Sequence, residues 1–395
     1  MTENSLSRRD FIKASLAAAV GGLELITGCA TTETAKSSKM EAVPASVKAE
    51  PVVYQRLADK KVQAPENGCL VGFRREYVRY YAAGHDNIVK LISQSNSVDE
   101  AQQALEKNNW KKTVKLREAV DDCTKYYPKH LGRNPAIFVL YDTPKLFLGF
   151  PTIESEPLAD KEVIPYINAW PNFGARGSLR LSLSEIAKGK HDKYIHNFAE
   201  GAKRYGKNHG GVFMTTMEES NGYWYYWGQN SNFIPAWRHI WQIFEDQGAN
   251  QYATWVWEAS STEPHRRRPI HSPEMYYPGD KYVDWIGLSA FSKKGMDSDG
   301  MVFEALVGNT YEAMRKNHPN KPIMQAEFGK SQDGSQPRWL QNAYNSIKTM
   351  PGMKAAIYYD NITNVPGTYD DKTLSQKSLQ TLKEIFKDPY FIMAK

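Results

Sequence analysis

Short apolar runs recur along the chain from residue 69 onward, and stretches with the periodicity of amphipathic helices separate them. The runs cover residues 69–73, 136–141, 163–167, 211–217, 252–257, 283–288, 322–327 and 355–359. Continuous apolar runs of this length are typical of strands buried on both faces, with the intervening helices as parallel crossovers. Helical periodicity is clearest over residues 194–205, 233–247 and 337–350, and Gly206, Gly248 and Gly352 follow these stretches as predicted helix ends.

Eight such strand and helix units predict an α/β fold of the (β/α)8 type, the TIM barrel. A doubly wound open sheet is the alternative architecture. It is less favoured because no GxGxxG fingerprint follows a predicted strand and no GxxxxGK[ST] loop is present. Composition does not change between residues 60 and 395, and no solenoid repeat appears, so we expect a single barrel domain there.

The first 28 residues have the features of an export signal. Arg8 and Arg9 resemble a twin-arginine (Tat) motif, and the apolar run after them is too short for a membrane span of about 20 residues. The sequence ending at Cys29 resembles a lipobox, in which cleavage precedes a cysteine that then carries lipid. Residues 29–59, rich in Ser, Thr, Ala, Lys and Pro, predict a flexible tether. We therefore expect Tat export and a lipid anchor at Cys29 on the periplasmic or cell-surface face, most readily on the outer membrane.

Composition places the chain among globular proteins with an excess of aromatic residues: 395 residues, 41% hydrophobic, 24% charged and 12% aromatic. The net charge of +6 is mild, and no Lys/Arg block resembles a nucleic-acid-binding arm, so no nucleic-acid partner is expected. Cys69 and Cys123 could form one disulfide or remain two buried thiols. No nucleotide, haem, flavin or metal-binding motif is present, and we expect neither a cofactor nor a metal site.

Carboxylates follow two of the predicted strands. The fourth run leads into Glu218 and Glu219, and the seventh ends in Glu327. In a barrel of this type the carboxyl ends of the strands form the catalytic face. Two carboxylates across a cleft are what glycoside hydrolysis requires, one as the proton donor and one as the nucleophile or base. A single strand-end glutamate would more often be a solvated residue, but a pair among many aromatic residues favours catalysis.

Aromatic residues indicate the substrate class. Five of them stand together at residues 223–227, and Trp257 ends the fifth run. Flat rings stack on the apolar faces of pyranose sugars, and their polar edges reach hydroxyl groups. We therefore expect Trp224, Trp227 and Trp257 to be stacking platforms. Asn221 is a candidate for orienting the proton donor or a sugar hydroxyl.

Several ordered motifs together resemble glycoside hydrolase family 26, the family of many bacterial β-mannanases. They are residues 186–195, 219–228, 237–239, 255–257, 277–288 and 321–329, and the resemblance covers residues 163–329 well. It implies a (β/α)8 glycosidase that retains anomeric configuration, with the acid/base on strand four and the nucleophile on strand seven. Carried onto this chain, Glu219 is the acid/base and Glu327 the nucleophile. The two carboxyl groups of a retaining pair stand about 5–5.5 Å apart.

Two substrate-contacting positions depart from the family pattern. Glu218 stands where the family usually has a His, and Phe291 where it usually has a Tyr. An ionised glutamate accepts hydrogen bonds but donates none, and near Glu219 its charge would help keep one of the two protonated. Phe291 lacks the hydroxyl that in the family could bind the nucleophile. These departures leave the sugar of the central subsite open.

The sequence therefore predicts a retaining endo-glycosidase that acts on a β-linked polysaccharide: mannan, mixed-linkage glucan, xylan or the cell's own exopolysaccharide. The basic segment at residues 265–268 favours an acidic glycan, although such a run is more often a solvated loop. Two other classes remain open. One is a polysaccharide-binding lipoprotein without turnover, and the other is a transglycosylase that takes part in envelope polysaccharide assembly.

Overall fold

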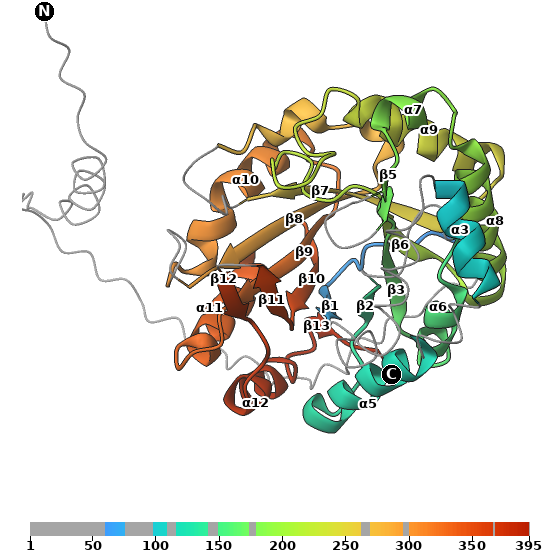
Figure 1. The fold of residues 1–395 in the computed structure, drawn as a ribbon. Coiled ribbons are helices and arrows are strands. Elements are labelled where there is room, and N and C mark those ends of the chain that lie inside the picture. The colour runs from blue at the N-terminus through green and yellow to red at the C-terminus, as the bar shows by residue number, and fades with distance from the viewer. Residues whose placement is uncertain are drawn as a thin grey trace, which may run out of the picture. The chain divides into compact units, whose positions relative to one another are not determined.

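Eight parallel strands close into a barrel in the computed structural model of the chain (Figure 1). The structure describes residues 60–75, 98–108, 116–140, 149–173, 179–261, 269–294, 300–365 and 368–394. The predicted export signal, Cys29, the tether and the basic segment 265–268 lie outside these described residues. Nothing in the fold therefore bears on them.

The barrel strands follow one another around the ring in chain order. They are β1 (Cys69–Arg74), β2 (Ile137–Leu140), β3 (Ile164–Asn168), β6 (Val212–Thr215), β7 (Ala253–Ser260), β8 (Trp285–Ser292), β9 (Ile323–Lys330) and β10 (Met353–Tyr359). Parallel pairing of β10 with β1 closes the ring, and the short β13 (Phe391–Ile392) adds to the start of β1. Each of the eight predicted apolar runs coincides with one barrel strand. The predicted (β/α)8 fold is confirmed.

Helices surround this ring (Figure 1). They are α3 (Val98–Lys107), α5 (Leu116–Leu131), α6 (Thr152–Ala159), α7 (Leu183–Ala187), α8 (Asp192–His209), α9 (Phe233–Asp246), α10 (Phe303–Asn317), α11 (Gln336–Thr349) and α12 (Gln376–Ile385), with single 3-10 turns at Pro273–Tyr276 and Asp280–Tyr282. No helix among the described residues combines the length and apolar character that a membrane crossing needs.

Strand alternation divides the buried side chains into two layers. On β7, Val256 joins the cluster inside the barrel, whereas Trp255 and Trp257 join the cluster between the barrel and the helices. Trp255 packs edge-on against Trp237 and Phe244 of α9, with ring centroids 5.6 and 5.1 Å apart. Truncating a ring of this kind to alanine costs about 3–5 kcal/mol, so the outer layer fixes the helices firmly to the strands.

One predicted helix end is wrong. Helix α8 continues through Gly206 and ends at Gly210, which has a φ of 83°. Gly206 is needed for packing instead: a Cβ there would lie 2.3 Å from Cγ of Tyr252, so only glycine lets α8 approach that ring. Gly248, with a φ of 66°, directly follows the cap of α9, as predicted. Helix α11 already ends at the extended residue Met350, and Gly352, with a φ of 80°, lies in the turn that leads into β10.

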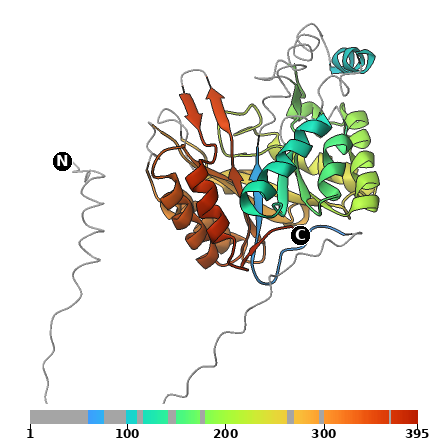
Figure 2. The ribbon, with the colours of Figure 1, turned by 90° about the horizontal axis from the view of Figure 1, so that it is seen from below.

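Two antiparallel hairpins extend the face at the carboxyl ends of the strands. The first, β4 (Asn172–Phe173) with β5 (Leu179–Arg180), follows β3, and the second, β11 (Ile362–Val365) with β12 (Thr368–Asp371), follows β10. Figure 2 shows the β11–β12 hairpin and α3 projecting from the same end of the barrel. These hairpins extend the C-terminal face of the barrel, where the active sites of (β/α)8 enzymes lie.

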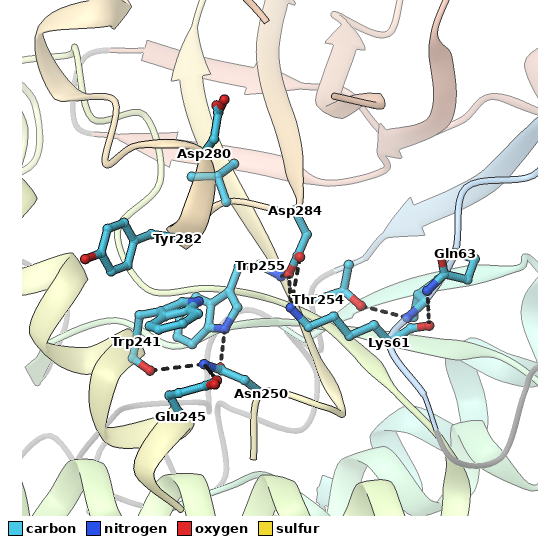
Figure 3. Close-up of polar contacts among 12 residues, drawn as sticks. Lys61, Gln63, Trp241, Glu245, Asn250, Thr254, Trp255, Asp280, Tyr282 and Asp284 are labelled. Carbon is cyan, nitrogen blue, oxygen red and sulfur yellow. Dashed lines mark hydrogen bonds and ion pairs between the residues drawn. The ribbon is translucent and has the colours of Figure 1, made fainter. Parts of the chain in front are cut away.

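At the opposite end, the segment that precedes β1 contacts residues at the starts of β7 and β8, as Figure 3 shows for Lys61 and Asp284. The ammonium group of Lys61 lies 2.8 and 2.9 Å from the two carboxylate oxygens of Asp284, which also accepts a hydrogen bond from the backbone N–H of Trp255. The backbone N–H of Val62 donates to the hydroxyl of Thr254 at 2.7 Å, and its side chain joins the cluster inside the barrel. Because this network lies at the amino ends of the strands, it contributes to stability and not to chemistry.

Cys69 begins β1 as a buried free thiol. Burial raises the pKa of this thiol well above its usual range, so it stays protonated and unreactive. The predicted alternative of a disulfide with Cys123 is not formed in the structure, where Cys69 has no bridge; the side chain of Cys123 lies outside the described residues.

Candidate active site

Glu219 lies on the tight segment that follows β6. Its backbone has a φ of 48°, in the left-handed region that non-glycine residues seldom adopt. The flanking bonds hold this conformation: the N–H of Ser220 donates to the carbonyl of Glu258 at 3.1 Å, and the N–H of Gly222 donates to the carbonyl of Glu219 at 2.9 Å. Such strain persists where the surrounding structure over-determines it, which is common at active sites.

The carboxyl group of Glu219 is nearly buried and has one aromatic donor. The indole N–H of Trp224 donates to it at 2.5 Å. Burial raises the pKa of Glu219 above its ordinary value, and the negative charge of Glu327 raises it further. The positive charge of Lys293 and the indole hydrogen bond oppose this shift. The net direction favours the protonated form, which is the form of a proton donor.

Glu327 lies on β9 and is paired with an arginine from β1, across the β10–β1 pairing that closes the barrel. Arg74, the last residue of β1, donates to it in an ion pair with both side chains nearly buried. The guanidinium also lies 4.5 Å from the ring centroid of Tyr359. This charge-assisted hydrogen bond fixes the position of the carboxylate of Glu327, as a nucleophile requires. The sequence prediction missed Arg74 because the first apolar run ends one residue before it.

Glu218 points toward β3 and the aromatic segment. The amide of Asn168 donates to one of its oxygens, and the hydroxyl of Tyr225 donates to the other at 2.6 Å. Burial first, and then the charge of Glu327, raise the pKa of Glu218 to about 8 against the opposing charge of Arg74. Glu218 is therefore largely a neutral carboxylic acid at pH 7 and not the ionised acceptor that the sequence alone suggests.

Glu258 is a fourth buried carboxyl group that the sequence prediction missed. It lies on β7, where the hydroxyl of Tyr166 donates to it. Burial, followed by the charges of Glu218 and Glu327, raises its pKa well above the ordinary range. The sequence did contain a signal for it: side chains alternate between the two faces of β7, and this alternation puts Glu258 on the same inward face as Val256. The predicted run stopped one residue too early to include it.

The indole N–H and phenol O–H groups of the aromatic segment 223–227 form hydrogen bonds that position two of these carboxyl groups. Trp224 and Tyr225 bind Glu219 and Glu218, and Tyr226 donates to the carbonyl of Pro171 at 2.5 Å. Trp224 and Tyr225 are each partly exposed. The prediction that Trp224 contacts a sugar is thus compatible with its position, and it stays a prediction.

Two of the predicted stacking platforms are wrong. Trp227 and Trp257 are both 0% exposed, so neither ring face can meet a sugar. Trp227 stacks under Tyr225 with ring centroids 4.4 Å apart and donates to the carbonyl of Glu218 at 2.8 Å. Trp257 faces outward from β7 and packs edge-on against Tyr277. Period-two alternation turns it away from the barrel mouth.

Asn221 also has a different role from the predicted one. Its amide group donates to the carbonyls of Ser260 and His271 at 2.9 and 3.2 Å, and its oxygen accepts from the N–H of Ser260 at 2.8 Å. The side chain is buried and its hydrogen bonds go to the main chain, not to Glu219 or into the cleft. Asn221 joins the segment after β6 to the end of β7.

Phe291 lies on β8, next to Gly329 of β9, and is largely buried. Its ring meets that of Tyr359 edge-on at 5.3 Å, and the ammonium groups of Lys293 and Lys372 each lie 5.4 Å from its centroid. The position thus contributes an apolar face, bordered by positive charge, near the carboxylate of Glu327. Among the described residues no histidine, cysteine and carboxylate side chains form a group suited to a metal ion.

Comparison with known proteins agrees with this geometry. The family model described as glycosyl hydrolase family 26 matches residues 179–394. Endoglucanase H of Acetivibrio thermocellus is 32% identical over 180 residues, which are 42% of this chain and 19% of that protein. A mannan endo-1,4-beta-mannosidase of Caldalkalibacillus mannanilyticus is 25% identical over 107 residues, 25% of this chain and 20% of that protein. The chain thus spans about a fifth of the length of these relatives.

Solved structures resemble the fold across most of the chain. The catalytic domain of a family 26 endo-beta-1,4-mannanase from Bacillus sp. JAMB-750 superposes with a TM-score of 0.54 at 15% identity, covering 88% of this chain and 95% of that one. The family 26 domain of an endo-beta-mannanase/endo-beta-glucanase from Prevotella bryantii has a TM-score of 0.51 at 14% identity, covering 83% and 91%. At these identities the likeness shows the barrel fold. The match of the family model over more than half of the chain shows more, and the chain belongs to glycosyl hydrolase family 26.

Proposed function

We propose that the protein is a retaining endo-glycoside hydrolase that cleaves a β-linked polysaccharide by double displacement. One observation carries the proposal: two nearly buried carboxyl groups have different surroundings. Glu327 is paired with the guanidinium of Arg74, whereas burial and the charge of Glu327 raise the pKa of Glu219. A nucleophile and a general acid need such different surroundings in the same site.

In the first step, Glu327 attacks the anomeric carbon while Glu219 protonates the glycosidic oxygen, so that a covalent glycosyl-enzyme forms and the leaving chain departs as an alcohol. In the second step, Glu219, now a carboxylate, takes a proton from water, and the water oxygen displaces Glu327. Once Glu327 is esterified its negative charge is gone, so one of the two influences that raise the pKa of Glu219 is removed at the stage where Glu219 must be ionised, while burial remains.

The family and the names of the relatives, an endoglucanase and a mannan endo-1,4-beta-mannosidase, support the proposed substrate class. We propose a β-mannan or a related β-glycan, the cell's own exopolysaccharide included. Trp224 is the residue proposed to stack on a sugar, because it combines a partly exposed ring with a hydrogen bond to the acid/base.

The experiment is release of reducing ends by the full chain, carrying Cys29→Ser to prevent lipidation, from β-mannan, β-glucan, xylan and acidic exopolysaccharides. Activity on one polymer that is lost in Glu219→Ala and Glu327→Ala, but kept in the surface control Glu274→Ala, supports the proposal. Azide should rescue Glu219→Ala on an aryl glycoside and give a β-glycosyl azide. Binding without release by wild type and both variants alike would contradict it and favour a binding protein.

Export and anchoring are proposed from the N-terminal sequence alone. We expect the twin arginines to direct Tat transport and Cys29 to carry lipid on the outer membrane. Labelling of cells with a clickable fatty acid should tag the wild-type chain and leave Cys29→Ser untagged. A tag that persists in Cys29→Ser would contradict the anchor, and export that survives replacement of Arg8 and Arg9 by lysine would contradict the Tat route.

A further inference from the structure

Positive charge and aromatic rings alternate along the wall of the barrel mouth that contains Glu327. The ammonium of Lys293 lies 5.4 Å from the ring of Phe291, and that ring is also 5.4 Å from the ammonium of Lys372. Lys372 lies 5.9 Å from the ring of Tyr359, whose centroid is 4.5 Å from the guanidinium of Arg74. We call these five residues the cationic wall. Its members come from β8 and the residue that follows it by one position, from β10 and β1, and from the segment after β12.

Glycine at position 329 brings the cationic wall close to the nucleophile. Gly329 is two residues beyond Glu327 on β9, and a Cβ there would lie 3.1 Å from Cδ of Lys372 and 3.6 Å from the ring of Phe291. The missing side chain lets the stem of Lys372 cross β9 beside the ring. Lys372 is 1% exposed, so it is not available for direct contact with a ligand.

Lys293 is the member of the wall that a ligand can touch. It follows the end of β8, it is partly exposed, and its charge acts on the carboxyl group of Glu219. Strand β8, which Lys293 follows, stands between β6 and β9 in the order of strands around the ring, and these two strands lead to Glu219 and carry Glu327. An ammonium at such a position attracts and binds anionic groups of an incoming chain.

Two buried carboxyl groups on the neighbouring strands do not exclude an anionic ligand. Glu218 follows β6 and Glu258 lies on β7, and burial raises the pKa of both groups, that of Glu218 to about 8. The raised pKa values favour the neutral forms, which do not repel an anion beside Lys293. The carboxylate of Glu327 is paired with the guanidinium of Arg74.

We propose that the sugar bound next to Glu327 carries an anionic substituent, a carboxylate or a sulfate ester, and that Lys293 binds it. This inference rests on the proposed glycosidase function and specifies its substrate class. It is independent of the basic segment at residues 265–268, which lies outside the described residues.

The test uses one polymer in two forms: a uronic-acid-containing β-glycan, and the same polymer after chemical reduction of its carboxyl groups to alcohols. A sulfated β-glycan and its desulfated form separate the two anion chemistries. The full chain is compared with Lys293→Met, which keeps the length of the side chain without its charge. Lys294→Met is the matched control, because Lys294 is the exposed neighbour.

Wild type should cleave one anionic polymer with a kcat/KM about 10–100 times that for its neutral form, as expected for a hydrogen bond to a charged group. Lys293→Met should bring the ratio of the two kcat/KM values close to 1, whatever its effect on kcat through the pKa of Glu219, and Lys294→Met should keep the wild-type ratio. Equal or better cleavage of both neutral forms by wild type would overturn the inference and leave the hydrolase intact. If no polymer is cut, affinity electrophoresis decides: retardation by an anionic polymer that is lost only in Lys293→Met supports the anion site, and its absence refutes it.

Discussion

The guanidinium of Arg74 and the carboxylate of Glu327 form a nearly buried ion pair although 253 residues separate them in sequence. Each lies near the carboxyl end of its strand, and the pairing of β1 with β10, next to β9, brings them together. The β10–β1 pairing that closes the barrel therefore helps to form the candidate catalytic site.

Replacing Arg74 by alanine should lower kcat roughly 100-fold or more, because the carboxylate of Glu327 loses the group that fixes its position and charge. The variant should also lose about 3–5 kcal/mol of stability, since a buried charge is left without its partner. Arg75→Ala is the matched control: it breaks the neighbouring ion pair with buried Asp360. It should reduce the thermal midpoint while the kcat of the folded protein stays within a few-fold of wild type. Loss of kcat in both variants alike would remove the specific role of Arg74.

Replacing Trp224 by phenylalanine should move the alkaline limb of the pH–activity profile to higher pH. The indole hydrogen bond lowers the pKa of Glu219, so its removal raises that pKa further. A general acid loses activity as pH rises through its pKa, and a higher pKa therefore keeps it protonated to higher pH. Profiles of kcat/KM for both proteins test this. An unchanged or acid-shifted limb would contradict the assignment of Glu219 as the acid.

Glu218 should make the protein less stable as the pH rises. Its pKa is raised from 4.5 to about 8, so between these values the folded protein holds a proton that the unfolded chain has released. Stability is fully present below pH 4.5 and falls up to pH 8, with a limiting slope of about 1.4 kcal/mol per pH unit for this group.

Glu218→Gln should remove that part of the slope, because the amide stays neutral at every pH. Asn168 can adjust to the change, since its amide oxygen accepts no hydrogen bond among the described residues and either end of its amide can turn toward residue 218. Urea denaturation of wild type and variant from pH 5 to 9 tests this. Parallel stability curves would show that Glu218 is already ionised in the folded state.

Asn221→Ala should destabilise the protein by about 2–4 kcal/mol, because it leaves two carbonyls and one N–H of the main chain without their partner. Asn317→Ala, which removes an exposed hydrogen bond to Glu274, should change stability by less than about 0.5 kcal/mol. Thermal melts of both variants measure the difference. A stable Asn221→Ala protein without activity would restore the role in catalysis that the sequence suggests.

The strands of the barrel could be predicted from the sequence because each is buried on both faces and therefore reads as an apolar run. The two strand-end carboxylates were found for the same reason, since each interrupts the apolar pattern where a strand reaches the mouth. Arg74 and Glu258 were missed because the pattern marks where apolar residues stop and cannot show which polar residue beyond that point turns inward.

The aromatic residues show a different limit of sequence reasoning. Trp224 and Trp227 are alike in type and stand three residues apart, yet one is partly exposed and the other is buried beneath Tyr225. The segment is neither helix nor strand, so no period assigns its side chains to faces. Gly206 shows the same limit for glycine, since a helix end and a close helix contact both favour it and only the position of Tyr252 distinguishes them.

Closure of the barrel by β10 has a consequence for the order in which the protein becomes functional. Arg75 and its partner Asp360 are 285 residues apart, and at about 5–20 residues per second the ribosome makes the second roughly 15–60 seconds after the first. During that interval β1 lacks its neighbour β10, and Arg75 lacks its partner Asp360. A chain released before β10 is made has most of its helices and both proposed catalytic glutamates but cannot assemble the ring that holds them. Completion of synthesis and assembly of the candidate catalytic site are therefore nearly the same event.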